Sequence, residues 1–126
     1  MNTLGPMSLV RAAVPQLGDG GSVVLLSAIV ADAPTLRMAE YSASKAALSA
    51  WASVLRRELR PRGLAVLDVK PQHVDTGLVD RALAGTPPRL PVGLDREAVV
   101  DTVLEGMRTG AKEVVLDPRA GVLVLR

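Results

Sequence analysis

With 126 residues, of which 48% are hydrophobic and 22% charged, the chain is long enough for one domain with one hydrophobic core, and its composition excludes wholesale disorder. No apolar run approaches the roughly 20 residues that span a bilayer, and the absence of cysteine excludes disulfides and thiolate metal sites. The formal net charge is only +2, basic residues are scattered among acids and aromatic residues make up 2%, which argues against nucleic-acid binding.

Three helices and three strands are predicted along the chain. Apolar residues at helical spacing mark the helices, and short apolar runs bounded by glycine, proline or polar residues mark the strands. The expected helices span 2–17, about 38–60 and 95–107, and the expected strands span 23–26, 64–69 and 113–116, followed by an apolar tail at 122–125. Pro15 is expected to end or bend the first helix, and Asp95 is expected to cap the third. Proline and glycine make 71–94 mostly loop.

The order of these segments predicts the fold class. Strands covered on both faces and joined by helices form right-handed β-α-β crossovers. We therefore expect an α/β fold, a partial Rossmann-like parallel sheet of about three strands flanked by helices. Such sheets place ligand sites at the carboxyl ends of their strands. The loops after Leu26 and Val69 should thus lie on one edge, beside the start of the long helix.

One pair of side chains at that edge can carry chemistry. Tyr41 is the only tyrosine, and Lys45 follows it by one helical turn on the same predicted face. An ammonium within about 4–6 Å of a phenol favours the phenolate and makes the hydroxyl a usable general acid or base. The spacing by itself is a weak signal, because an amphipathic tyrosine and a solvated lysine also fit an ordinary surface helix.

Four segments match a known family pattern in order and spacing. They are Gly21–Ser27 (GSVVLLS), Tyr41–Leu48 (YSASKAAL), Arg57–Leu59 (REL) and Val69–Thr76 (VKPQHVDT). They resemble the short-chain dehydrogenase/reductase family, and the match extends from Asn2 to the third strand. Asn2-Thr3-Leu4-Gly5 is similar to the family's Asn-x-x-Gly, and 71–76 is similar to its Pro-Gly-x-Val-x-Thr segment, with Gln72 in place of the glycine.

The resemblance implies a reaction and roles for particular residues. The reaction is hydride transfer between NAD or NADP and a small-molecule alcohol/carbonyl pair. Tyr41 would donate or remove the substrate hydroxyl proton, Lys45 would assist it and bind the nicotinamide ribose, and Asn2 would support the proton relay through a water. The residues implied to contact the nicotinamide end of the cofactor are Tyr41, Lys45, Pro71, Val74 and Thr76.

The position of the family's catalytic serine is occupied by alanine. Counting thirteen residues back from Tyr41 reaches Ala28, which has no hydroxyl, and Ser27 lies one residue earlier. Strand alternation points Ser27 away from the site unless the chain turns there. A one-residue shift of the loop would instead bring Ser27 inward as the catalytic serine. Loss of such a donor typically costs about 10²–10³ in rate.

The family's glycine-rich Thr-Gly-x-x-x-Gly-x-Gly turn, which seats the cofactor pyrophosphate, does not occur in the sequence. We therefore expect 1–126 to be a single domain, the C-terminal, catalytic and substrate-side half of a Rossmann domain. The N-terminal nucleotide-binding half is expected to be absent, through a truncated gene or a misassigned start. This chain alone is then expected to bind neither NAD nor NADP measurably.

Two functions from different classes follow. The first is an NAD(P)-dependent oxidoreductase, and the alternative is a catalytically inactive remnant that serves at most as an oligomerisation or binding module. The resemblance also implies a homo-oligomer through the helices that begin near Asn2 and Tyr41, where an alanine-rich face and Trp51 suit close packing. His73 is the only histidine, so no metal site is expected. Without a signal segment or cysteine, a cytoplasmic location without a membrane partner is expected.

Overall fold

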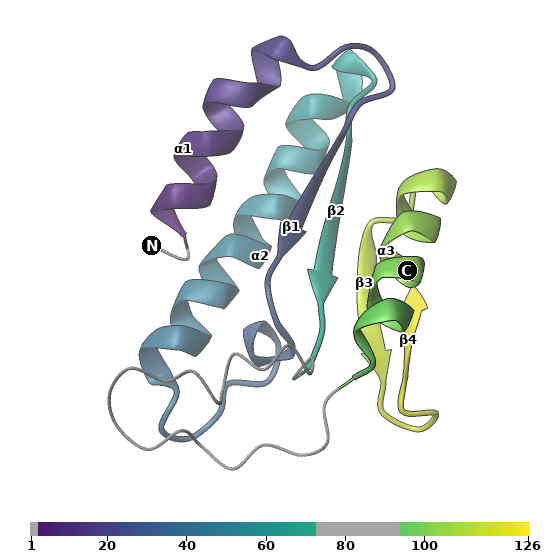
Figure 1. The fold of residues 1–126 in the computed structure, drawn as a ribbon. Helices are drawn as coiled ribbons and strands as arrows, with labels where there is room; N and C mark the ends of the chain where they lie inside the picture. Colours follow the sequence, from purple (N-terminus) through teal and green to yellow (C-terminus); the bar gives the residue numbers. More distant parts are fainter. Residues whose placement is uncertain (1–2, 73–93) are drawn as a thin grey trace.

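The computed structural model describes residues 3–72 and 94–126, which contain each predicted helix and strand with ends shifted by a few residues. The helices are α1 (Leu4–Ala13), α2 (Ala39–Leu59) and α3 (Arg96–Thr109), and the strands are β1 (Ser22–Leu26), β2 (Ala65–Lys70), β3 (Glu113–Asp117) and β4 (Val122–Leu125). Figure 1 shows their arrangement, with the long α2 connecting β1 to β2 and running in the direction opposite to both strands.

The sheet has the strand order β1-β2-β3-β4. β1 and β2 run parallel, with Leu26 opposite Val69, and β2 and β3 also run parallel, with Val69 opposite Val114. The β1-α2-β2 unit is the predicted crossover. Because β1 and β2 point the same way, their carboxyl ends meet at one edge of the sheet, where α2 begins (Figure 1).

The fourth strand is the main difference from the sequence prediction. The segment 122–125 was predicted only as an apolar tail of a parallel sheet with about three strands, but β4 pairs antiparallel with β3. The Asp117 side chain accepts the backbone N–H of Arg119 at 2.8 Å, and Gly121 takes φ 68°. This tight turn reverses the chain, so the tail returns along β3 as a hairpin and needs no crossover helix.

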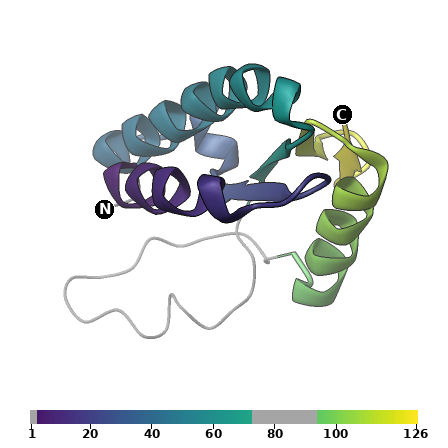
Figure 2. The ribbon, with the colours of Figure 1, turned by 90° about the horizontal axis from the view of Figure 1, so that it is seen from above.

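Helices cover both faces of the sheet (Figure 2). α1 and α2 lie against one face, called here the α2 face, and α3 lies against the other, the α3 face. The buried cluster on the α2 face consists of Val23, Leu25, Leu48, Ala52, Leu55, Leu59, Leu64 and Val66, with Trp51 packed against it. The buried cluster on the α3 face consists of Leu67, Val69 and Val114. Consecutive residues of β2 thus serve opposite cores, as the two-residue period of a strand requires.

The predicted helix ends are confirmed at two places. α1 ends at Ala13, and a 3₁₀ turn that contains Pro15 follows it. The side chain of Asp95 accepts the backbone N–H of Ala98 at 3.1 Å and caps α3. At the other end of α3, Gly110 takes φ 71°, a left-handed conformation that glycine adopts without steric cost.

Candidate active site

Tyr41 and Lys45 lie in the first turns of α2, at the edge where β1 and β2 end. The Lys45 ammonium lies 5.7 Å from the centroid of the Tyr41 ring, within the range of a cation–π contact. The Tyr41 side chain remains accessible, with 39% of its surface exposed. The helix therefore brings the two predicted residues together and leaves Tyr41 partly exposed to solvent.

The Lys45 side chain is anchored on β1. Its Nζ donates a hydrogen bond to the backbone carbonyl of Leu26, the last residue of β1, at 2.7 Å. Burial lowers the pKa of Lys45 below its usual value, and the negative charge of Asp68 acts against that shift. Since an ammonium carries three N–H donors, the Leu26 carbonyl leaves donors of Lys45 for a further partner.

The loops after β1 and β2 are tied together at this edge, which confirms their predicted proximity. The backbone N–H of Ile29 donates to the carbonyl of Pro71 at 3.1 Å. Asp32, at the end of the 3₁₀ turn Ile29–Ala31, forms an ion pair with Lys70 at 3.0 Å. Pro71, a predicted cofactor-contacting residue, therefore lies beside the loop that carries Ala28.

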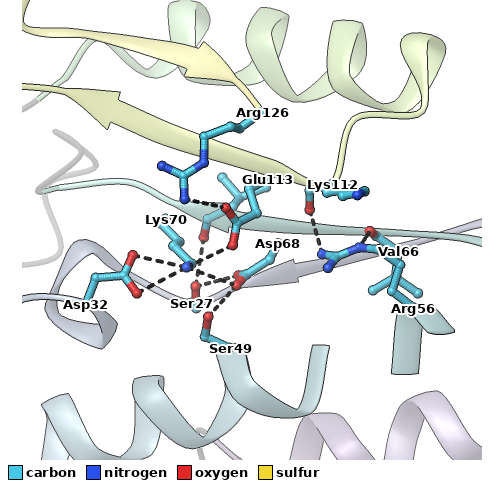
Figure 3. Close-up of polar contacts among 11 residues, drawn as sticks. Ser27, Asp32, Ser49, Arg56, Val66, Asp68, Lys70, Lys112, Glu113 and Arg126 are labelled. Atoms are coloured by element: carbon cyan, nitrogen blue, oxygen red, sulfur yellow. Dashed lines mark hydrogen bonds and ion pairs between the residues drawn. The ribbon is translucent and has the colours of Figure 1, made fainter. Parts of the chain in front are cut away.

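Lys70 is the centre of an ion-pair network (Figure 3). Its Nζ lies 3.0 Å from both the Asp32 and Glu113 carboxylates and 3.9 Å from Asp68, and Arg126 pairs with the other oxygen of Glu113. Burial by itself would lower the pKa of Lys70, but the hydrogen bonds and charges of Asp32 and Glu113 outweigh it and raise the pKa above its usual value. The loop after β1, the end of β2 and the start of β3 are joined through this one side chain.

Ser27 is buried and bound to a carboxylate. Its side chain is on the α2 face, as its spacing from Val23 and Leu25 requires, and only 4% of its surface is exposed. The hydroxyl donates to one oxygen of Asp68 at 2.5 Å, and the hydroxyl of Ser49 in α2 donates to the other at 2.6 Å (Figure 3). Within 3–72 and 94–126, no hydrogen bond joins Ser27 to Tyr41.

Of the remaining positions singled out by the sequence, the structure describes only Ala28. Ala28, at the family's usual serine position, is 7% exposed and extended, with φ −168° and ψ 164°. Asn2, Val74 and Thr76 lie outside the described residues, as does His73.

Sequence reasoning missed Asp68, Ser49 and the Lys70 network. A signal was present, because Asp68 is a charged residue within the otherwise apolar run 64–69. A charge inside a buried strand is rare without a partner. The partners themselves are 19 and 41 residues away in the sequence, so no local spacing identifies them.

Two other features are absent from the described segments. No group of three or more His, Cys, Asp or Glu residues there is arranged to hold a metal ion. None of the described helices combines the length and the apolar character that crossing a membrane requires.

Comparison with known proteins identifies the family. The sequence model of a family described as short chain dehydrogenase matches residues 1–86. The chain belongs to the short-chain dehydrogenase family. Its four-stranded α/β sheet with flanking helices is accordingly a Rossmann-like fold of this family.

Individual members of the short-chain dehydrogenase family resemble the chain in sequence and structure. An uncharacterized oxidoreductase of Methylorubrum extorquens is 39% identical over 87 residues, which are 68% of this chain and 35% of that protein. A short chain dehydrogenase from Burkholderia cenocepacia, solved in complex with NADP, has a TM-score of 0.78 and 30% identity, covering 94% of this chain and 48% of that one. A short-chain dehydrogenase from Sphingobium yanoikuyae, in complex with NADPH, has a TM-score of 0.76 and 28% identity, covering 89% and 44%. The chain thus spans less than half the length of these three proteins.

Proposed function

We propose that this chain supplies the acid/base and substrate side of an NAD(P)-dependent oxidoreductase that acts on an alcohol/carbonyl pair. The observation that carries the proposal is the geometry of Tyr41 and Lys45. Tyr41 is partly exposed, and the centroid of its ring lies 5.7 Å from an ammonium that the Leu26 carbonyl holds at the carboxyl edge of the sheet. Membership of the short-chain dehydrogenase family supports the same chemistry.

In the direction of reduction, the Tyr41 hydroxyl donates its proton to the carbonyl oxygen of the substrate, and the resulting phenolate is stabilised by the Lys45 ammonium. In the direction of oxidation, the phenolate removes the hydroxyl proton. A bound nicotinamide cofactor supplies or accepts the hydride. The proton transferred by Tyr41 must be replaced after each turnover, and the partial exposure of its side chain is consistent with exchange of that proton with solvent.

The donor set of the chain fits the nicotinamide end of a cofactor. Lys45 retains N–H donors beyond the one that the Leu26 carbonyl accepts, and ribose hydroxyls are suitable acceptors. Pro71 lies at the same edge, and Val74 and Thr76, which the family pattern assigns to this contact, follow it in sequence. The glycine-rich turn that would hold the pyrophosphate is not in the sequence, so we propose that the adenosine side of the site lies in a nucleotide-binding half outside these 126 residues.

The test is turnover of alcohols and ketones by a form that carries such a half ahead of Met1. Tyr41→Phe should abolish turnover and leave cofactor affinity nearly intact, because it removes only the hydroxyl group that carries the transferred proton. Ser8→Ala, at an exposed serine of α1, serves as the matched control. Turnover by Tyr41→Phe within about threefold of the parent would remove Tyr41 from the mechanism.

The alternative function, an inactive remnant that acts as an oligomerisation or binding module, is favoured by one observation. The Ser27 hydroxyl is buried and committed to Asp68, and Ala28 has no hydroxyl, so neither offers a free donor to a substrate oxygen. Ala28→Ser in the longer form distinguishes the two functions: a higher rate supports an enzyme short of one donor. If neither parent nor variant turns over, and the longer form binds neither NADH nor NADPH by nicotinamide fluorescence, the alternative holds.

Self-association through α1 and α2 is proposed for either function. Small or apolar residues line an exposed face of α2 at helical spacing: Ala43, Ala47, Ala50 and Val54. In α1, Leu9 is 71% exposed. A second copy of the chain would cover both. Light scattering should show a dimer or larger assembly, which Ala47→Arg should disrupt. Val100→Arg, at an exposed position of α3, should leave the assembly intact. A monomeric parent contradicts this proposal.

A further inference from the structure

The buried carboxylate of Asp68 joins two segments of the chain. Only 1% of its surface is exposed. One oxygen accepts the Ser27 hydroxyl, just after β1, and the other accepts the Ser49 hydroxyl, in α2 (Figure 3). Both carboxylate oxygens are thereby hydrogen-bonded, and the end of β1 is fixed relative to Ser49, one helical turn beyond Lys45 in α2.

The same two segments meet a second time through Lys45. Ser49 lies one helical turn beyond Lys45 on the same face of α2, and Ser27 directly follows Leu26, whose carbonyl accepts the Lys45 ammonium at 2.7 Å. The hydrogen bonds of Asp68 therefore fix the distance between the end of β1 and α2, which the Lys45 side chain spans to bind the Leu26 carbonyl.

The charge of Asp68 has a second consequence for this lysine. Burial lowers the pKa of Lys45, and Asp68 is the group that opposes this shift. The charged and titratable groups around the pair are Tyr41 on the helix of Lys45 itself, and Lys70 beside Asp68 at 3.9 Å. Lys70 is in turn paired with Asp32 and Glu113.

We propose that Asp68 is a positioning residue for Lys45: through Ser27 and Ser49 it holds β1 and α2 at the separation at which the Lys45 ammonium binds the Leu26 carbonyl, and its charge complements that ammonium. The inference rests on the proposed function in that Lys45 serves Tyr41. It assigns Ser27 to this support and not to the substrate.

The first test measures lysine titration by NMR of the labelled 126-residue chain. The sequence contains only three lysines, so each Nζ and Cε signal can be assigned by substitution. Asp68→Asn keeps the shape and removes the charge, and it should lower the titration midpoint of Lys45. The matched control, Asp32→Asn, should lower the midpoint of Lys70 and leave that of Lys45 unchanged. The exposed Lys112 is the internal reference.

The second test separates position from charge. Ser49→Ala keeps the Asp68 charge but removes the hydrogen bond to α2, so the Lys45–Leu26 bond should loosen and hydrogen exchange of the Lys45 ammonium with water should accelerate. Ser8→Ala, at an exposed serine of α1, should leave that exchange unchanged. A role of Asp68 in stability alone would lower the melting temperature in both substitutions and move neither Lys45 signal.

Each outcome decides the proposal. A Lys45 midpoint that is the same in Asp68→Asn as in the parent, or ammonium exchange that is the same in Ser49→Ala, overturns it. Both measurements are made without substrate or cofactor, so their failure is distinct from failure of the proposed function, which the Tyr41→Phe turnover experiment decides.

Discussion

The two faces of strand β2 differ in chemistry. Toward α3 the strand presents Leu67 and Val69, which are at most 2% exposed and pack with Val114. Toward α2 it presents Val66 and then Asp68 and Lys70, charged residues with only 1% and 6% exposure. Among the described residues, the buried cluster on the α3 face is apolar, whereas the α2 face turns polar toward the carboxyl end of the strand, beside the candidate active site.

This difference shows where the chain buries charged residues in place of apolar ones, and those charged residues position neighbouring segments. Burying a charge is costly unless it is paired and hydrogen-bonded, and apolar residues of similar volume often stabilise as well or better. Asp68 and Lys70 are fully partnered, and their partners are the segments that border Tyr41 and Lys45. Among the described residues, the buried cluster of the α3 face includes no candidate site residue and no such charged group.

The largest loss of folding stability is expected from a substitution in the polar part of the α2 face. Lys70→Met removes the cation nearest to the buried Asp68 carboxylate and leaves Glu113 with Arg126 alone, and it should destabilise the fold by about 3–5 kcal/mol near neutral pH. Because the folded pKa of Lys70 is raised, its contribution is complete below the unfolded lysine pKa of about 10.4 and is lost as pH rises through the folded value. Denaturation between pH 7 and 11 should show the gap between parent and variant closing at alkaline pH; a constant gap contradicts this account.

The apolar face should respond differently. Leu67→Ala removes a side chain that is 2% exposed and leaves a cavity beneath α3, at a cost of about 2–5 kcal/mol. No titrating group is involved, so the loss should stay the same across the pH range in which Lys70→Met changes. A pH-dependent loss in Leu67→Ala would show that the two faces are coupled.

A smaller effect is expected from one arm of the Asp68 contact. Ser27→Ala removes a hydrogen bond to a buried carboxylate and should cost about 1.5–3 kcal/mol in urea denaturation. The exposed Ser8→Ala should change stability by less than about 0.5 kcal/mol. Equal stability of the two variants would mean that the Ser27–Asp68 bond contributes nothing net.

The smallest loss of stability is expected at the start of α3, outside the buried clusters of both faces. Asp95→Ala removes the side-chain cap of α3 and should cost about 1 kcal/mol, measured by the same denaturation. Asp95→Asn, which can still cap, should recover most of it. A Lys45 NMR signal altered by Asp95→Ala would contradict the separation of α3 from the candidate site.

The sequence predicted the parts of the site that depend on local spacing. Tyr41 and Lys45 are four residues apart in a helix, so their proximity follows from helical geometry alone. The meeting of the loops after Leu26 and Val69 follows from two parallel strands, and Ile29 and Pro71 confirm it. The polarity of the α2 face was not predicted, because a lone Asp68 in an apolar run does not reveal which hydroxyls will satisfy it.

The sequence by itself determined the helices, the first three strands, the end of α1 just before Pro15 and the cap at Asp95, because each depends on periodicity or on the chemistry of one turn. Only the tertiary structure decided that 122–125 is an antiparallel strand and that Asp68 binds Ser27 and Ser49. An apolar run of four residues does not by itself specify parallel or antiparallel pairing, which depends on the neighbouring strand that it pairs with. A buried carboxylate likewise acquires its partners only when packing brings distant segments together and excludes water from between them.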